Sequence, residues 1–296
     1  KGQIITRSMV EIKSPGQGLQ PLYIDQLIGR SAIRDFVKGD FFYESDLNDV
    51  PVESRNYSFS RPFGIPVRYH DYDKLKAKSN LDFVEFHLSY QDLELNLADF
   101  FIDQQAMGFA VHSTELFAND HILDLASEDD EYRIKSIDYL NKVCEITRQL
   151  KHYFPVTERP VIVVNAGGFN TKGFIPKEKT AQLYKRVAES LSQVNQAGVE
   201  IIIQTMPPFP WHFGGQSYHN LFVDYTEISD FCSNTGYRIC FDTSHSMMAC
   251  NYYGWDFHEF TLAVAKYTAH MHIVDALGVD GEGVQIGKGD VDFEIL

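Results

Sequence analysis

The stretch YRICFDTSH, residues 237–245, joins a short apolar run to an aspartate and a histidine that lie three positions apart. Short runs of this kind are typical of strands in a sheet that is buried on both faces. The polar end of the run would then lie at the carboxyl edge of the sheet. Asp242 and His245 are therefore either a metal site at that edge or an acidic turn that contains a histidine.

The same pattern recurs along the chain after residue 60. The predicted strands are FGIPVRYHD (63–71), LDFVEFHLS (81–89), GFAVHS (108–113), PVIVVNAGG (160–168), VEIIIQT (199–205), YRICFDTSH (237–245) and YTAHMHIVDA (267–276). Helical patterns separate them; one spans residues 127–150, where Ser127 and Asp130 predict a capping box. Seven β/α steps predict an α/β fold of the TIM barrel class rather than a doubly wound sheet. An eighth strand does not occur before Leu296, so we expect the barrel to be incomplete at this end.

Composition narrows the class of protein. The 296 residues include 26 Lys and Arg against 41 Asp and Glu, a formal charge of −15, which disfavours nucleic acid as a partner. No apolar run approaches the roughly 20 residues of a membrane span, and the first residues lack the pattern of a signal peptide. The four cysteines form no CxxC pair, which is typical of reduced thiols. We expect a cytoplasmic protein that binds neither membranes nor nucleic acid.

Polar residues fall at the ends of the predicted strands, where the chemistry of a TIM barrel is located. One such residue is ordinary, and its usual role is to cap a strand or a helix. Their convergence at one edge instead indicates a site for a metal or a sugar. They are His70, Asp71, His87, His112, Asn165, Gln204, Asp242, His245, His272 and Asp275.

Residues 61–296 resemble the xylose isomerase-like superfamily, which includes sugar isomerases, sugar epimerases and apurinic endonucleases of the endonuclease IV type. The matching motifs are FDTSH (241–245), MHIVDA (271–276) and QIGKGDVDF (285–293). The resemblance implies that His112, Asp242, His245 and His272 are ligands of a divalent metal. Imidazole and carboxylate ligands suit Zn, Mn or Fe(II), and an open coordination position can polarise a sugar carbonyl.

Two positions depart from the family pattern. Gln204 stands where the family usually has a glutamate, and Asn165 stands where the endonucleases have a histidine. Neutral amides coordinate metals weakly and carry no proton at neutral pH. We therefore assign both amides to substrate orientation, and we expect Glu282 or Glu85 as the substitute carboxylate. The alternative is a polar pocket of sugar size that holds no metal.

The loop MPPFPWHFGGQSYHN, residues 206–220, follows the fifth predicted strand directly. Aromatic faces stack on sugar rings, so Trp211 and His212 are candidate substrate-binding residues on a lid over the mouth. The alternative is a proline-fixed loop that packs against a neighbouring subunit.

Residues 1–50 resemble the SAF, or antifreeze-like, domain at the C-terminus of sialic acid synthases. VEIKSPGQG (10–18) and IGRSAIRDFVKGDFFYESDL (28–47) carry this resemblance. Similar segments at 1–10 and 38–47 predict a small β-rich unit, incomplete at its start, and a polar linker spans residues 51–60. In the synthases an arginine before the Pro-Gly turn contacts the sugar of a dimer partner. Here that position is Ser14, which leaves Lys13 as the candidate contact, and the resemblance implies a homodimer.

The leading hypothesis is a sugar or sugar-phosphate isomerase or epimerase in sialic or related nonulosonic acid synthesis. Glu282 and His245 are its candidate catalytic residues, and a divalent metal is its cofactor. The second hypothesis is a catalytically silent module that binds sugar or organises a synthase dimer, which Gln204 and Ser14 favour. A third, apurinic-site repair, follows from the same DTSH motif and is opposed by the net charge.

Overall fold

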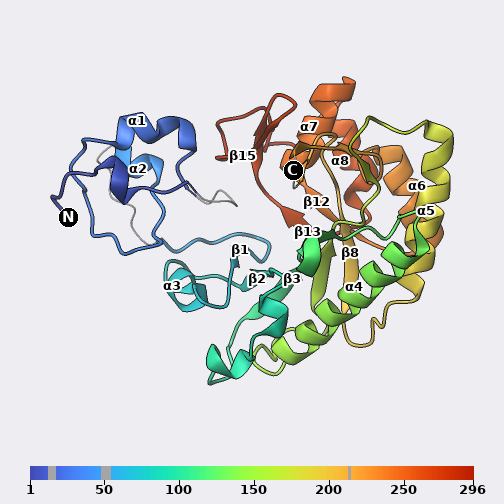
Figure 1. Ribbon diagram of the computed structural model, residues 1–296, viewed down its shortest axis with the longest axis horizontal. Helices are drawn as coiled ribbons and strands as arrows, with labels where there is room; N and C mark the ends of the chain where they lie inside the picture. Colours follow the sequence, from blue (N-terminus) through green and yellow to red (C-terminus); the bar gives the residue numbers. More distant parts are fainter. Residues whose placement is uncertain (13–17, 48–54, 213–214) are drawn as a thin grey trace. The chain divides into compact units, whose positions relative to one another are not determined.

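The computed structural model describes residues 1–12, 18–47, 55–212 and 215–296, and the side chains of residues 211–216 lie outside that description (Figure 1). The chain divides into two compact units. Lys1–Ser58 and Ala77–Asn80 form the first; Phe59–Lys76 and Leu81–Leu296 form the second.

The first unit has a small core of Ile5, Leu27, Ala32 and Leu47. Its helical segments are η1 (Arg7–Met9), η2 (Pro21–Tyr23), α1 (Ile24–Leu27) and α2 (Glu44–Leu47). The segments 1–10 and 38–47, expected to be β-rich, contain no named strand in the described residues, where extended segments meet in one β-bridge, between Ile4 and Ser31. The reason is that residues 2–5 pair with residues 29–32, through bonds such as Ala32 N to Gln3 O at 2.8 Å, rather than with their sequence neighbours.

The second unit is built on a seven-stranded parallel sheet in the order β1-β2-β3-β6-β8-β12-β13, which confirms the predicted TIM-barrel-like α/β fold. All seven lie within the ranges predicted from sequence. They are β1 (Gly64–Val67), β2 (Phe83–His87), β3 (Gly108–His112), β6 (Val161–Val164), β8 (Glu200–Gln204), β12 (Ile239–Asp242) and β13 (Thr268–His272). Among the described residues, no strand joins β13 to β1.

The strand register brings the polar strand ends together. His87 pairs with His112, and Asp242 pairs with His272. Because side chains alternate along a strand, Val163, Ile202 and Cys240 share one face with the polar residues two positions later. These three form a small buried cluster of their own, which is the apolar floor beneath the polar layer.

Helices cover the other face of the sheet, where the main hydrophobic core lies. They are α3 (Tyr72–Lys76), α4 (Asp130–Leu150), α5 (Lys177–Ser192), α6 (Tyr225–Thr235), α7 (Thr243–Tyr253) and α8 (Phe257–Ala265). The N-cap of α4 is Asp129, whose carboxylate accepts from Glu131 N and Tyr132 N, and not Ser127 as predicted. Ser127 Oγ instead accepts from Asp129 N at 3.3 Å, in the turn that leads into the helix.

Short strands and 3-10 turns lie in the segments that follow the strands of the sheet, at its carboxyl edge. They are η3 (Asp92–Glu94), η4 (Leu97–Asp99), β4 (Leu116–Phe117), η5 (Ala118–Asp120), β5 (His121–Ile122), β7 (Phe169–Asn170), β9 (Trp211–His212), β10 (Gly215–Gln216), β11 (Tyr218–His219), β14 (Asp275–Leu277) and β15 (Gly281–Val284), counting the 3-10 turns between them. The cysteines Cys144, Cys232, Cys240 and Cys250 are free and buried. No described helix is both long enough and apolar enough to cross a bilayer.

Candidate functional site

A hydrogen-bonded polar layer lies at the carboxyl ends of the strands, with Gln204 at its centre. Gln204 is buried, and its Oε1 lies 2.9 Å from His112 Nε2. Its Nε2 donates to Asp242 Oδ2 at 2.9 Å and lies 3.0 Å from His272 Nδ1. The structure therefore brings together three of the predicted ligands, but around an amide rather than around the usual glutamate.

Charge is unevenly distributed in this layer. Burial, assisted by the neighbouring His87, lowers the pKa of His112 to about 4, so the imidazole of His112 is neutral at physiological pH. Burial acts to raise the pKa of Asp242, but His245 and His272 outweigh it and hold that pKa at about 2. Asp242 is also the N-cap of α7, where its Oδ1 accepts from His245 N at 2.9 Å. Asp242 is thus an anion whose oxygens are already engaged.

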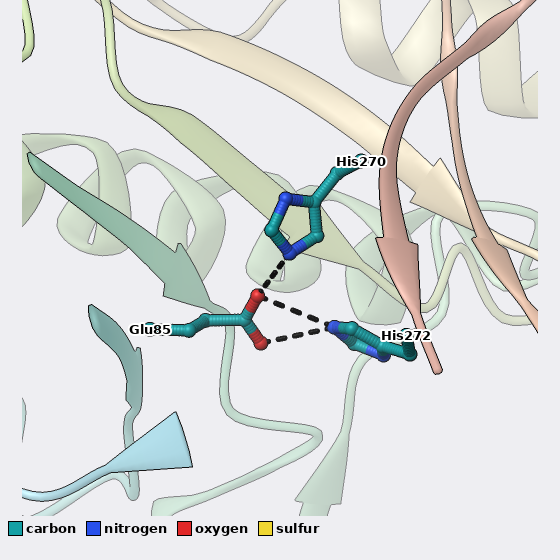
Figure 2. A group of neighbouring side chains, drawn as sticks. All are labelled: Glu85, His270 and His272. Carbon is teal, nitrogen blue, oxygen red and sulfur yellow. Dashed lines mark hydrogen bonds and ion pairs between the residues drawn. The ribbon is translucent and has the colours of Figure 1, made fainter. Parts of the chain in front are cut away.

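Glu85 on β2 lies beside this layer, with imidazoles directed at its carboxylate (Figure 2). His270 Nε2 lies 2.6 Å from Oε2, and His272 Nε2 lies 3.0 Å from Oε1. A third imidazole, that of His87, approaches Oε1 at 2.6 Å. Burial acts to raise the pKa of Glu85, but the positive His272 and the hydrogen bonds from the imidazoles keep it well below its ordinary value.

Glu85, His270 and His272 form a group that could hold a metal ion. Their ligand atoms all lie within 4.8 Å of one another. Nitrogen from imidazole and oxygen from carboxylate are the donors that Zn, Mn and Fe(II) share. The other nitrogen of His272 lies 3.3 Å from Asp242 Oδ2, the arrangement in which a carboxylate orients a metal-binding histidine. The donor set fits a divalent metal, with Asp242 behind a ligand rather than as a ligand.

His245 and Glu282 form a pair at the same mouth. His245 Nδ1 donates to Thr205 O at 2.8 Å, and its Nε2 lies 3.2 Å from Glu282 Oε1. Burial opposes the charge on His245, but Asp242 and Glu282 raise its pKa to about 9. The charge of His245 in turn lowers the pKa of Glu282, whose side chain is 55% exposed. The two candidate catalytic residues named from the sequence are therefore in contact with each other.

Asn165 faces a carboxylate that the sequence did not single out. Its Nδ2 donates to Glu115 Oε1, while its Oδ1 is buried and has no partner among the described residues. Glu115 follows β3, and the pair lines a hollow together with Gly167, Phe169 and His219. Asn165 is thus held at the mouth, with one acceptor free.

Other predicted residues lie apart from this network or outside the description. The side chain of His70 is 71% exposed, and its Nε2 lies 3.9 Å from Asp71 Oδ2. Trp211 and His212 form β9, but their side chains lie outside the described part of the chain. Lys13 also lies outside the described residues.

Two functional candidates escaped the sequence reading. His270 lies two positions before His272, so strand alternation, which puts both on one face, could have identified it. Glu115 follows His112 in the segment HSTEL, and no periodic signal marks it, because a loop carries it to Asn165.

Comparisons with known proteins agree with this architecture. A family described as the xylose isomerase-like TIM barrel matches residues 74–296, and a SAF domain matches residues 1–48. No curated protein matches the chain.

Solved structures similar to the chain share its fold. An L-ribulose 3-epimerase is 18% identical, with a TM-score of 0.52 over 79% of this chain and 75% of its own. A xylose isomerase domain protein from Planctomyces limnophilus is 16% identical, with a TM-score of 0.51 over 79% and 84%. A probable 3-DHS dehydratase of petrobactin synthesis from Bacillus anthracis is 13% identical, with a TM-score of 0.51 over 79% and 86%.

Proposed function

The chain belongs to the xylose isomerase-like TIM barrel family, and we propose that its barrel is a divalent-metal-dependent sugar isomerase or epimerase. One observation carries the proposal: the ligand atoms of Glu85, His270 and His272 lie within 4.8 Å of one another, and His272 ends β13 at the carboxyl edge of the sheet, where barrel enzymes place their chemistry. A sugar epimerase among the structures of the same fold is in keeping with it.

The residues of the mouth divide into three roles. Glu85, His270 and His272 would hold the metal, which when bound would polarise a sugar carbonyl or hydroxyl. Gln204 and neutral His112 hydrogen-bond to each other and give the mouth a polar lining without adding charge, which would orient a sugar. The ion pair of His245 and Glu282 joins a buried imidazole to an exposed carboxylate and is a candidate for proton transfer.

The finer assignment rests on the resemblance of the first unit to the SAF domains of sialic acid synthases. The SAF match over residues 1–48 supports a place in sialic or nonulosonic acid synthesis, in which the barrel would act on an aminosugar or its phosphate. We also propose that the protein acts in the cytoplasm as a homodimer, with domains at 1–50 and 61–296 joined by the linker 51–60.

The test is metal content by mass spectrometry of protein purified without chelator. We expect near-stoichiometric Zn, Mn or Fe, a loss of about tenfold or more in His270→Ala, and no loss in His70→Ala, since His70 is exposed. The metal-replete protein should then convert a sugar in a panel of pentoses, hexoses, aminosugars and their phosphates. Full metal in His270→Ala, or no conversion of any sugar, would contradict the proposal.

A second function, a silent sugar-binding module, is favoured by Gln204. This amide occupies the centre of the polar layer, and both of its polar atoms are bonded within the layer. Sugar binding without conversion, unchanged by Gln204→Glu, would identify that function.

A further inference from the structure

The mouth of the barrel has several carboxylates, and most of them already have hydrogen-bond or ion-pair partners. Glu85 is held by imidazoles, Asp242 caps α7 and accepts from Gln204, and Glu282 pairs with His245. Glu115 differs, since within the described residues its side chain accepts one hydrogen bond, from Asn165, and this bond reaches only Oε1. Within the described part of the chain, Oε2 of Glu115 is therefore available to a ligand.

The position of Glu115 makes it reachable. Its side chain is exposed, yet it lines a hollow whose other wall includes Asn165, Gly167 and His219. Withdrawal from bulk water raises its pKa above the usual value; Glu282 on β15 acts in the same direction, while His245 on α7, His87 on β2 and the bond from Asn165 act against it. A raised pKa favours a carboxyl group that both takes up and gives back a proton.

The second observation is the unsatisfied oxygen of Asn165. The residue is 7% exposed, and its Oδ1 is buried without a partner. A buried acceptor without a hydrogen bond costs about 1–3 kcal/mol, so a donor at this point gains that amount. A sugar hydroxyl is such a donor, and it would be held against the carboxylate of Glu115.

We propose that Glu115 is a further acid–base residue of the barrel, beside the pair of His245 and Glu282, and that Asn165 holds a substrate hydroxyl next to it. The inference rests on the proposed isomerase function. Gln204 is an amide and cannot carry a proton at neutral pH, whereas the carboxyl group of Glu115 can. Glu115 as a carboxylate takes the proton from the carbon next to the sugar carbonyl. The C–H electron pair forms the double bond of an enediolate as the carbonyl electrons move to oxygen. Glu115 returns the proton to the former carbonyl carbon, while the hydroxyl proton on the first carbon passes to the enediolate oxygen, so that the first carbon becomes the new carbonyl. The product is the isomeric sugar, and no oxidant or reductant is consumed.

The experiment uses the full chain loaded with Mn²⁺. Incorporation of deuterium from D₂O into a panel of ketopentoses, ketohexoses and N-acetylated aminosugars is followed by NMR, and binding of xylitol, which has hydroxyls but no carbonyl, by calorimetry. We expect Glu115→Gln to slow exchange by about 100-fold or more while its affinity for xylitol stays within about twofold. Glu115→Asp should retain measurable exchange, because it keeps a carboxyl group. Asn165→Ala should weaken xylitol binding by about tenfold.

The control is Glu178→Gln, an exposed carboxylate on α5, which should exchange as the wild type does. Thermal unfolding checks that each variant is folded. Wild-type exchange in Glu115→Gln, or loss of xylitol binding in the same variant, would overturn the role of Glu115 and leave the isomerase proposal standing. Absence of exchange in the wild type with every sugar would overturn the isomerase proposal, and this inference with it.

Discussion

Gln204 shows how one side chain can set the charge of a site. It fills the space between His112 and Asp242 and donates to the carboxylate of Asp242 at 2.9 Å. A glutamate there would replace this donor with a second anion, and neighbouring carboxylates repel each other unless a cation lies between them. The amide therefore makes the layer stable without a metal of its own.

Replacement of Gln204 by Glu tests this balance. We expect the variant to lose about 1–3 kcal/mol of unfolding free energy in the presence of a chelator, because a buried hydrogen bond becomes a repulsion. Excess Mn²⁺ should recover much of the loss, since binding to the folded state stabilises it. Thermal unfolding with and without metal measures both effects. Gln91→Glu, at an exposed position, is the control, and equal stability of the two variants in chelator would contradict the argument.

The pH dependence of metal-free protein should show the ion pairs of the mouth. His245 has its pKa raised from 6.5 to about 9, so its contribution is complete below pH 6.5 and is lost as the pH rises through 9. Asp242 has its pKa lowered from 3.8 to about 2, so its contribution is present above pH 3.8 and is lost as the pH falls to 2. Calorimetry between pH 6 and 10 should show a falling unfolding temperature that is flatter in His245→Gln. If the unfolding temperature falls equally with pH in the wild type and in His245→Gln, groups other than His245 cause the loss of stability.

Among the elements, the segment from β14 to residue 291 is organised by a single carboxylate. Asp275 accepts from Gly287 N at 2.9 Å, Gly289 N at 2.7 Å and Val291 N at 3.0 Å. Gly289 has no room for a side chain, because a methyl group would overlap Ala276 and Asp275. β15, which carries Glu282 to His245, belongs to the same segment.

Asp275→Asn should loosen this segment, because an amide can accept at only one of its two polar atoms. We expect a loss of about 1–3 kcal/mol and faster amide exchange over residues 281–291, with β6 and β8 unchanged. Hydrogen exchange with mass spectrometry provides the measurement. Asp280→Asn, at an exposed position of the same segment, should leave exchange unaltered. Protection that is retained in Asp275→Asn would mean that other contacts hold Glu282 in place.

The strands were predictable because their apolar runs are short and are bounded by turns, and the order of the sheet followed from the β/α repeat. Strand ends were therefore predictable too, which placed His112, Gln204, Asp242 and His272 in one layer. The hydrogen-bond and ion-pair partners of each side chain could not be predicted from the sequence. Asp242 contacts one nitrogen of His272 and Glu85 contacts the other, and no pattern in the sequence indicates this pairing. The first unit was misread for a related reason: its pairing joins segments that are distant in sequence.

The net negative charge of the whole chain affects which partners it can bind. With a formal charge of −15, it repels phosphate backbones, and this repulsion is strongest at low ionic strength. We expect no retardation of duplex DNA that contains an abasic site, even at about 50 mM salt, by gel shift with micromolar protein. Retardation of the DNA that weakens as salt is added would instead support the hypothesis of apurinic-site repair.

The buried cysteines provide a way to observe the barrel opening. Burial raises the pKa of Cys144, Cys232 and Cys250 to about 12 and that of Cys240 to about 11, so none is a thiolate in the folded protein. An alkylating reagent can therefore modify each sulfur only when the surrounding structure separates. The sulfurs lie on α4, α6, α7 and β12. Peptide mapping during slow alkylation would therefore show when each of these elements separates from the core. Cys240, on the inner face beneath Asp242, should be the last to react, and the order of the other three would record where unfolding begins.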